Sequence, residues 1–262
     1  TLDQPNTVGV CRYRRAVGDA SALGVLVTDR EGTDYHNRVA GADGYLRLSA
    51  NDTVRFQWLG SDTRYPRQVA ADNAQPAAPF GGAAYELYYG HSTRDWNWWF
   101  DGGLRSSRFR VDAGFMPRVG MRWADVGAER VLWGDARRWF NRLRFSIEMS
   151  RMSPDTGGFL YDNIDLYARY EGPLQSTFNL RRTWSRERYS GVDFDTSGEG
   201  FFFNIRPTGD FTTSLDVSYD RAVDYDNVKP GRVLNVTPGF TYNIGRHLYV
   251  QGDHTSERFY RD

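Results

Sequence analysis

Residues 140–151 read FNRLRFSIEMSR, and this stretch decides the fold class. From Leu143 to Met149 every second side chain is apolar, while the side chains between them are Arg, Ser or Glu. An alternation with a period of two places apolar side chains on one face of a β-strand and polar side chains on the other. The stretch therefore predicts a strand that separates an apolar environment from a polar one.

The same alternation recurs along the chain in segments of roughly nine to thirteen residues. The composition agrees with this, because 15% of the residues are aromatic and aromatic side chains suit a pleated surface. We predict thirteen strands, at 22–29, 37–48, 52–60, 83–92, 96–105, 121–133, 140–151, 160–170, 174–184, 198–206, 211–219, 232–243 and 247–255.

The connections between these strands are predicted to alternate between short and long. The long ones are at 61–82, 106–120, 152–159, 185–197 and 220–231. Tight turns on one side and long loops on the other are typical of an up-and-down barrel that crosses a membrane, whereas a Greek-key sandwich has no reason to sort its loops in this way. We therefore expect an all-β, antiparallel up-and-down transmembrane β-barrel over residues 1–262. Thirteen is an odd count, so we expect the barrel to be incomplete at one or both ends and part of a larger, even-stranded one.

The charged faces of consecutive predicted strands indicate where a polar lumen would lie. A charged side chain facing lipid near the membrane midplane costs about 2–4 kcal/mol, so these side chains would have to face water. The candidate pore-lining residues are Arg142, Arg144, Glu148, Asp165, Arg169 and Arg181. One interpretation is a ring of fixed charge that sets ionic selectivity. The other is a lattice of cross-strand ion pairs that stiffens the wall, which the mixture of both signs favours.

Aromatic side chains near the strand ends predict interfacial girdles, because amphipathic rings favour the depth of the lipid headgroups. The girdle candidates are Trp58, Tyr85, Trp96, Trp98, Trp133, Tyr170 and Tyr219. The cluster of Trp96, Trp98 and Trp99 could also stack on a sugar ring, but an interfacial belt is the simpler interpretation.

Composition and spacing argue against several other classes of protein. The net charge is zero and Lys229 is the only lysine among 33 basic residues, so nucleic acid is not expected as a partner. Cys11 is the only cysteine, which excludes an internal disulfide and a cysteine-based zinc site. No window approaches 18 consecutive apolar residues, so no transmembrane helix is expected. We expect no cofactor and no metal, because the acidic stretch at 224–227 lacks the glycine and bidentate glutamate of a calcium loop.

No catalytic residue is predicted. The four histidines are scattered without the spacing of a metal-binding motif, and no serine lies in a GxSxG elbow. An outer-membrane hydrolase remains an alternative, because a catalytic triad is defined by geometry and can be assembled from separate strands.

Several stretches together resemble a known family. They are the strand and loop at 51–66, which ends TRYP, WNWW at 96–99, FRVDAGFMPR at 109–118, GPLQS at 172–176 and GVDF at 191–194. In this order they are similar to an uncharacterised bacterial outer-membrane β-barrel family whose full-length members carry an N-terminal family-9-type carbohydrate-binding-like domain. The resemblance covers roughly residues 24–195 and implies a location and an architecture. It brings no catalytic residue, and none of the residues here corresponds to the carbohydrate-binding-like domain.

These features predict an integral protein of the bacterial outer membrane that is not an enzyme. The leading hypothesis is a porin-like channel for small hydrophilic solutes in the lipid bilayer, with tight turns periplasmic and long loops extracellular. The alternatives are a structural or scaffold barrel within a larger cell-envelope assembly and, third, the hydrolase. The long loop at 61–82 could fold inward as a constriction or outward as a surface for protein partners.

Overall fold

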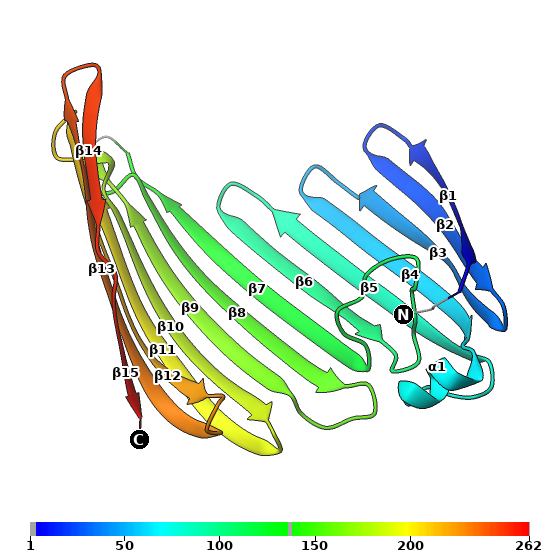
Figure 1. Ribbon diagram of the computed structural model, residues 1–262. Coiled ribbons are helices and arrows are strands. Elements are labelled where there is room, and N and C mark those ends of the chain that lie inside the picture. Colours follow the sequence, from blue (N-terminus) through cyan, green and yellow to red (C-terminus); the bar gives the residue numbers. More distant parts are fainter. Residues whose placement is uncertain (1–3, 136–137, 262) are drawn as a thin grey trace. The chain divides into compact units, whose positions relative to one another are not determined.

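The computed structural model describes residues 4–135 and 138–261, which form an antiparallel sheet with almost no helix (Figure 1). Strands account for 70% of the chain. From β1 to β14 each strand is hydrogen-bonded to its neighbour in the sequence, so the predicted all-β, up-and-down strand order is confirmed. The described strands form an open path, in which β1 and β14 are not paired with each other.

The sheet contains fifteen strands. They are β1 (Asn6–Val17), β2 (Ser21–Gly32), β3 (Tyr35–Arg47), β4 (Asp52–Arg64), β5 (Phe80–Ser92), β6 (Trp96–Arg105), β7 (Met121–Trp133), β8 (Arg142–Pro154), β9 (Tyr161–Glu171), β10 (Thr177–Tyr189), β11 (Val192–Ile205), β12 (Phe211–Asp224), β13 (Lys229–Ile244), β14 (Leu248–Asp253) and β15 (Ser256–Arg261). The described helices are α1 (Arg67–Asp72) and the 3-10 turn η1 (Pro173–Gln175). Neither is long and apolar enough to cross a membrane.

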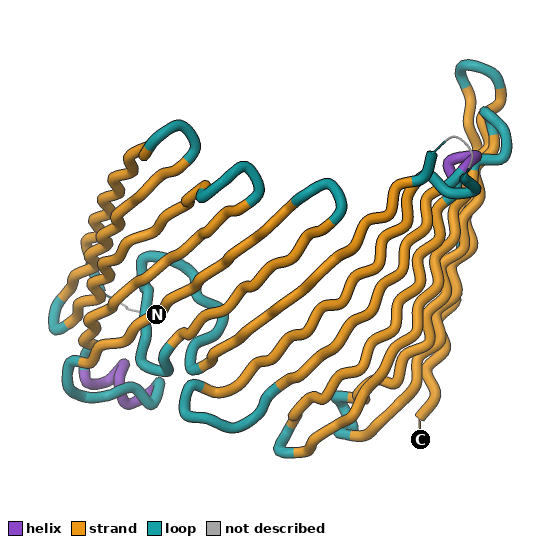
Figure 2. The backbone as a smooth tube through the Cα atoms, turned by 180° about the vertical axis from the view of Figure 1, so that it is seen from behind, coloured by secondary structure: helices purple, strands orange, loops and turns teal. Residues whose placement is uncertain are grey.

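Three of the five connections predicted to be long are short. The expected loops at 152–159, 185–197 and 220–231 contract to 155–160, 190–191 and 225–228. The other two, at 65–79, which contains α1, and at 106–120, are long (Figure 2). The strict alternation of short and long connections was therefore wrong, because strands continue into segments that the sequence pattern assigned to loops.

The hairpin between β10 and β11 shows why. Its turn consists of Ser190 and Gly191, whose φ angles of 50° and 81° are the two positive values that a type I′ turn requires. Next to the turn, Asp193 pairs with Arg186 and with Arg188, so charged side chains hold the two strands together. Both faces of the hairpin are polar there, and the alternation that identifies a strand disappears although the backbone ladder continues.

The strands β14 and β15 are two halves of one strand. Both pair with β13 in a single continuous register. The ladder is interrupted at Pro238. The backbone N–H of His254 donates to the Pro238 carbonyl (3.1 Å), but proline has no N–H with which to donate to the opposite strand. The fifteen assigned strands thus amount to fourteen, where thirteen were predicted. The missed strand is β1, in which Arg12, Arg14 and Arg15 interrupt the alternation.

The chain divides into two compact units, and in each of them the sheet has one polar and one apolar face. Unit 1 comprises 1–91, 99–125 and 152–159, and unit 2 comprises 92–98, 126–151 and 160–262. The apolar face is exposed in both units: the side chain of Trp58 in unit 1 is 56% exposed and that of Leu180 in unit 2 is 54% exposed. A soluble sheet usually buries this face beneath a second layer, but no described element covers it here.

The main hydrophobic cluster lies on the opposite, polar face of unit 1. We call residues 106–120 the crossing segment, because they pass over this face of β2 to β5 near α1 (Figures 1 and 2). Phe109 of the crossing segment has no exposed surface and packs against Val39, Leu59 and Ala84. Burying a phenylalanine side chain contributes about 1.5–3 kcal/mol, so the segment is held firmly.

Candidate functional site

The polar face of unit 2 carries its charged residues in rows that cross the strands. One row contains Arg169, Asn179, Phe202 and Asp216, and the next contains Tyr167, Arg181, Gly200 and Ser218. A third row contains Asp165, Thr183, Gly198 and Asp220. The arginines therefore lie nearer to the end of the strands at η1, and Asp165 and Asp220 lie further from it.

Ion pairs neutralise these arginines only in part. Glu171 accepts from Nε of Arg142 (2.9 Å) and pairs with Nε of Arg169 (3.0 Å), so one carboxylate serves two guanidinium groups. Arg181 pairs with Asp220 through Nη2 (3.0 Å). Asp165 pairs with no arginine in the described residues and accepts hydrogen bonds from Thr183 and Asn163 instead.

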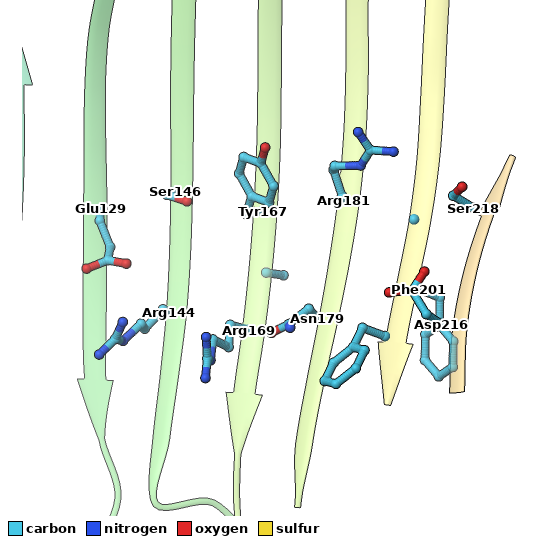
Figure 3. A pocket seen from close by; sticks show the side chains of 13 residues that line it. Glu129, Arg144, Ser146, Tyr167, Arg169, Asn179, Arg181, Phe201, Asp216 and Ser218 are labelled. Carbon is cyan, nitrogen blue, oxygen red and sulfur yellow. The ribbon is translucent and has the colours of Figure 1, made fainter. Parts of the chain in front are cut away.

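A cavity of about 510 Å³ lies over these rows. Arg144, Arg169 and Arg181 line it from three neighbouring strands, β8, β9 and β10. Figure 3 shows Arg144, Arg169 and Asn179 along one row, with Ser146, Tyr167 and Arg181 along the other. The cavity is open to solvent and combines cationic donors with neutral hydroxyl and amide groups. Such a surface can hold an anionic or strongly polar solute.

The structure brings together three of the six predicted pore-lining residues, namely Arg144, Arg169 and Arg181. Arg142 lies beside Glu171, Asp165 lies in the acidic row, and Glu148 lies further along β8, so these three do not line the cavity. Sequence reasoning missed Glu129, Asn179 and Asp216, which do line it. The alternation of β7, β10 and β12 places each of them on the polar face, and that signal could have found them. A pore-lining role stays a prediction.

The predicted girdle aromatics lie on exposed surface with one exception. Trp58, Tyr85, Trp96, Trp98, Trp133 and Tyr219 are exposed. Tyr170 instead stacks on Trp139 (ring centroids 5.3 Å apart) and donates its hydroxyl proton to the Trp139 carbonyl (2.9 Å). Trp99 is less exposed than its neighbours Trp96 and Trp98 and points to the other face of β6, so the three rings do not form one stacking platform.

Asp112 anchors the crossing segment to the polar face of unit 1. Its carboxylate accepts hydrogen bonds from the hydroxyls of Tyr35 (2.8 Å) and Tyr65 (3.0 Å). Its backbone N–H donates to Oδ1 of Asn37 (2.8 Å), and its carbonyl accepts from Arg30 (2.8 Å). Four partners on a single residue fix the segment in one position, because removing any partner would leave a partly buried polar group unsatisfied.

A second contact joins the crossing segment to the 65–79 connection. Arg110 donates to Oε1 of Gln75 through Nε (3.1 Å) and Nη2 (2.6 Å), and its backbone N–H donates to the Ser61 hydroxyl (3.2 Å). The loop predicted at 61–82, as an inward constriction or an outward surface for partners, is confined to 65–79, and through Gln75 it holds the crossing segment that covers the polar face.

Raising the pH above about 10 is expected to loosen the crossing segment. Burial of Tyr65, together with the neighbouring Asp112 carboxylate, raises the pKa of its hydroxyl above the ordinary value of about 10. When the crossing segment leaves the polar face, the pKa of Tyr65 returns to its ordinary value. Tyr65 of the released form therefore ionises at a lower pH than Tyr65 of the docked form. The docked arrangement therefore keeps its full stability below pH 10 and loses it progressively above.

The measurement is the anisotropy of a dye attached at Phe115→Cys, in a Cys11→Ser background, from pH 8 to 11. Phe115 is 88% exposed, so the dye should not disturb docking. Tyr65→Phe cannot ionise and should weaken the transition. A transition that is unchanged in this variant would contradict the assignment.

Within 4–135 and 138–261, no group of three or more His, Cys, Asp or Glu side chains could hold a metal ion. In the acidic stretch at 224–227, the Asp224 carboxylate accepts instead from the side chain of Asn227 (2.8 Å), as in an ordinary turn.

Comparison with known proteins assigns no family. No protein-family model matches the chain, and no curated protein is significantly similar to it in sequence. Function must therefore be argued from the two faces of the sheet and from the cavity.

Proposed function

We propose that this chain is a transmembrane β-barrel of the bacterial outer membrane that acts as a channel for small hydrophilic solutes. The observation that carries the proposal is the inverted pattern of exposure. Large apolar side chains are exposed on one face of the sheet, while the cavity and the arginines that line it occupy the other. A face of this kind is stable in contact with lipid, and the charged face then lines a water-filled passage.

Barrel closure is part of the proposal. In a bilayer every backbone N–H and C=O needs a hydrogen-bond partner, which closed barrels provide and open sheet edges do not. The outer edge of β1 and that of the β14–β15 strand carry unpaired backbone groups in the described sheet, so both edges must be paired when the protein is inserted.

The crossing segment limits the size of the proposed passage. It covers part of the polar face in unit 1 through Phe109 and Asp112, so we expect small conductance steps. If the crossing segment filled the passage completely, the protein would not conduct. A plugged scaffold barrel is therefore the second candidate.

Single-channel recording in a planar bilayer distinguishes the two candidates. The refolded protein should give stable open steps, and heat-denatured protein should give none. Heat-modifiable mobility on a gel reports folding independently. A correctly folded protein that never conducts would contradict the channel and favour the scaffold.

A further inference from the structure

The cavity in unit 2 has more positive charge on its β8–β10 side than its ion pairs neutralise. Arg169 shares Glu171 with Arg142, while Arg181 has Asp220 to itself. Arg144 has no ion pair among the described residues. Its Nε is buried and has no hydrogen-bond acceptor. A guanidinium N–H that is buried without an acceptor can donate a hydrogen bond to an anion.

Neutral donors surround this position. The side chains of Ser146, Tyr167 and Asn179 line the same cavity as Arg144 and Arg169 (Figure 3). Hydroxyl and amide N–H groups can donate to the oxygens that a guanidinium group leaves free. Together these groups match a compact anion with several oxygens better than they match a metal ion or an apolar ligand.

Two carboxylate side chains, Glu129 on β7 and Asp216 on β12, flank this position in the cavity lining. Glu129 accepts from the side-chain amide of Asn97 through Oε1 (2.8 Å). Asp216 lies on β12, three strands from Arg169 in the same row. At roughly 4.8 Å per strand, the backbones of these two residues are about 14 Å apart. Asp216 therefore repels an anion from the far side of the cavity and favours the β8–β10 side.

We propose that Arg144, Arg169 and Arg181 form a binding site for the anionic group of a solute, a carboxylate, phosphate or sulfate. This proposal rests on the proposed function, because solutes would reach the cavity through the channel. Arg144 supplies the planar donor pair for two oxygens of the anion, and Arg169 and Arg181 supply additional positive charge.

Binding of inorganic phosphate to the refolded full chain in detergent, measured by calorimetry at constant ionic strength, tests the site without requiring conduction. Arg144→Gln should weaken phosphate binding about tenfold or more. Arg144→Lys keeps the charge but loses the planar fork, so its affinity should be intermediate. Asp216→Asn should bind phosphate more tightly than the unaltered protein, because it removes a repelling charge. Acetate and sulfate show which anion the site prefers.

Arg55→Gln is the matched control. Arg55 also lies on a polar face, in unit 1, where its guanidinium stacks over Tyr88 at 4.1 Å, outside the cavity. Equal loss of binding in Arg55→Gln and Arg144→Gln would mean non-specific attraction and overturn the site. Conduction without phosphate binding would overturn the site and leave the channel. Binding without conduction would support the site and contradict the channel.

Discussion

Replacing Phe109 with alanine is expected to release the crossing segment from the polar face of unit 1. Phe109 is completely buried against Val39, Leu59 and Ala84. Removing a buried phenylalanine ring typically costs about 3–5 kcal/mol, because apolar contacts are lost and a cavity remains. The Asp112 hydrogen bonds hold a different part of the segment and are not expected to compensate fully for this loss.

Limited proteolysis with trypsin measures the release, because Arg108, Arg110 and Arg118 lie within the crossing segment. Phe109→Ala should be cleaved there much faster than the unaltered protein. Phe115→Ala is the matched control, because Phe115 belongs to the same segment but is exposed. If the two variants were cleaved at the same rate, Phe109 would not be the anchor. In a conducting barrel, the same release should also enlarge the single-channel conductance.

The second large effect concerns the exposed apolar face. Ile147→Arg should destabilise the protein in lipid vesicles by about 2–4 kcal/mol, which is the cost of a lipid-facing arginine near the midplane. Ile147 lies near the middle of β8 on the apolar face and is 36% exposed. Its neighbour Ser146 lies on the polar face and lines the cavity, so Ser146→Arg should be tolerated.

Urea unfolding in vesicles, followed by tryptophan fluorescence, compares these two variants. A surface exposed to water accepts arginine at little cost, usually within about 0.5 kcal/mol. Nearly equal stability of Ile147→Arg and Ser146→Arg would therefore contradict the contact with lipid. A large difference between them would support the assignment of the two faces.

The candidate site could be predicted only in part. The alternation in β8, β9 and β10 placed Arg144, Arg169 and Arg181 on one face, and the register brings them to one cavity. The same reasoning interpreted the charges as a mixed lattice. The structure contains cross-strand ion pairs, from Arg181 to Asp220 and from Arg142 to Glu171, but the register leaves Arg144 without an ion pair in the described residues. A shift of one residue in pairing would have changed those partners, and a single sequence does not determine pairing.

Local pattern alone determined the all-β class and the two faces, because period-two alternation is a property of neighbouring residues. The up-and-down order was also predicted correctly, although the alternation of short and long connections behind that prediction was wrong. The local pattern failed where both faces of a hairpin are polar, as beside Ser190 and Gly191, and where Pro238 interrupts a ladder from the opposite strand. Only the tertiary structure showed that Phe109 packs against Val39 and Leu59 and that Asp112 binds Tyr35, in strands at least 50 residues earlier in the chain. Such contacts depend on how backbone segments that are distant in the sequence pack together. The spacing of residues along the chain does not predict that packing.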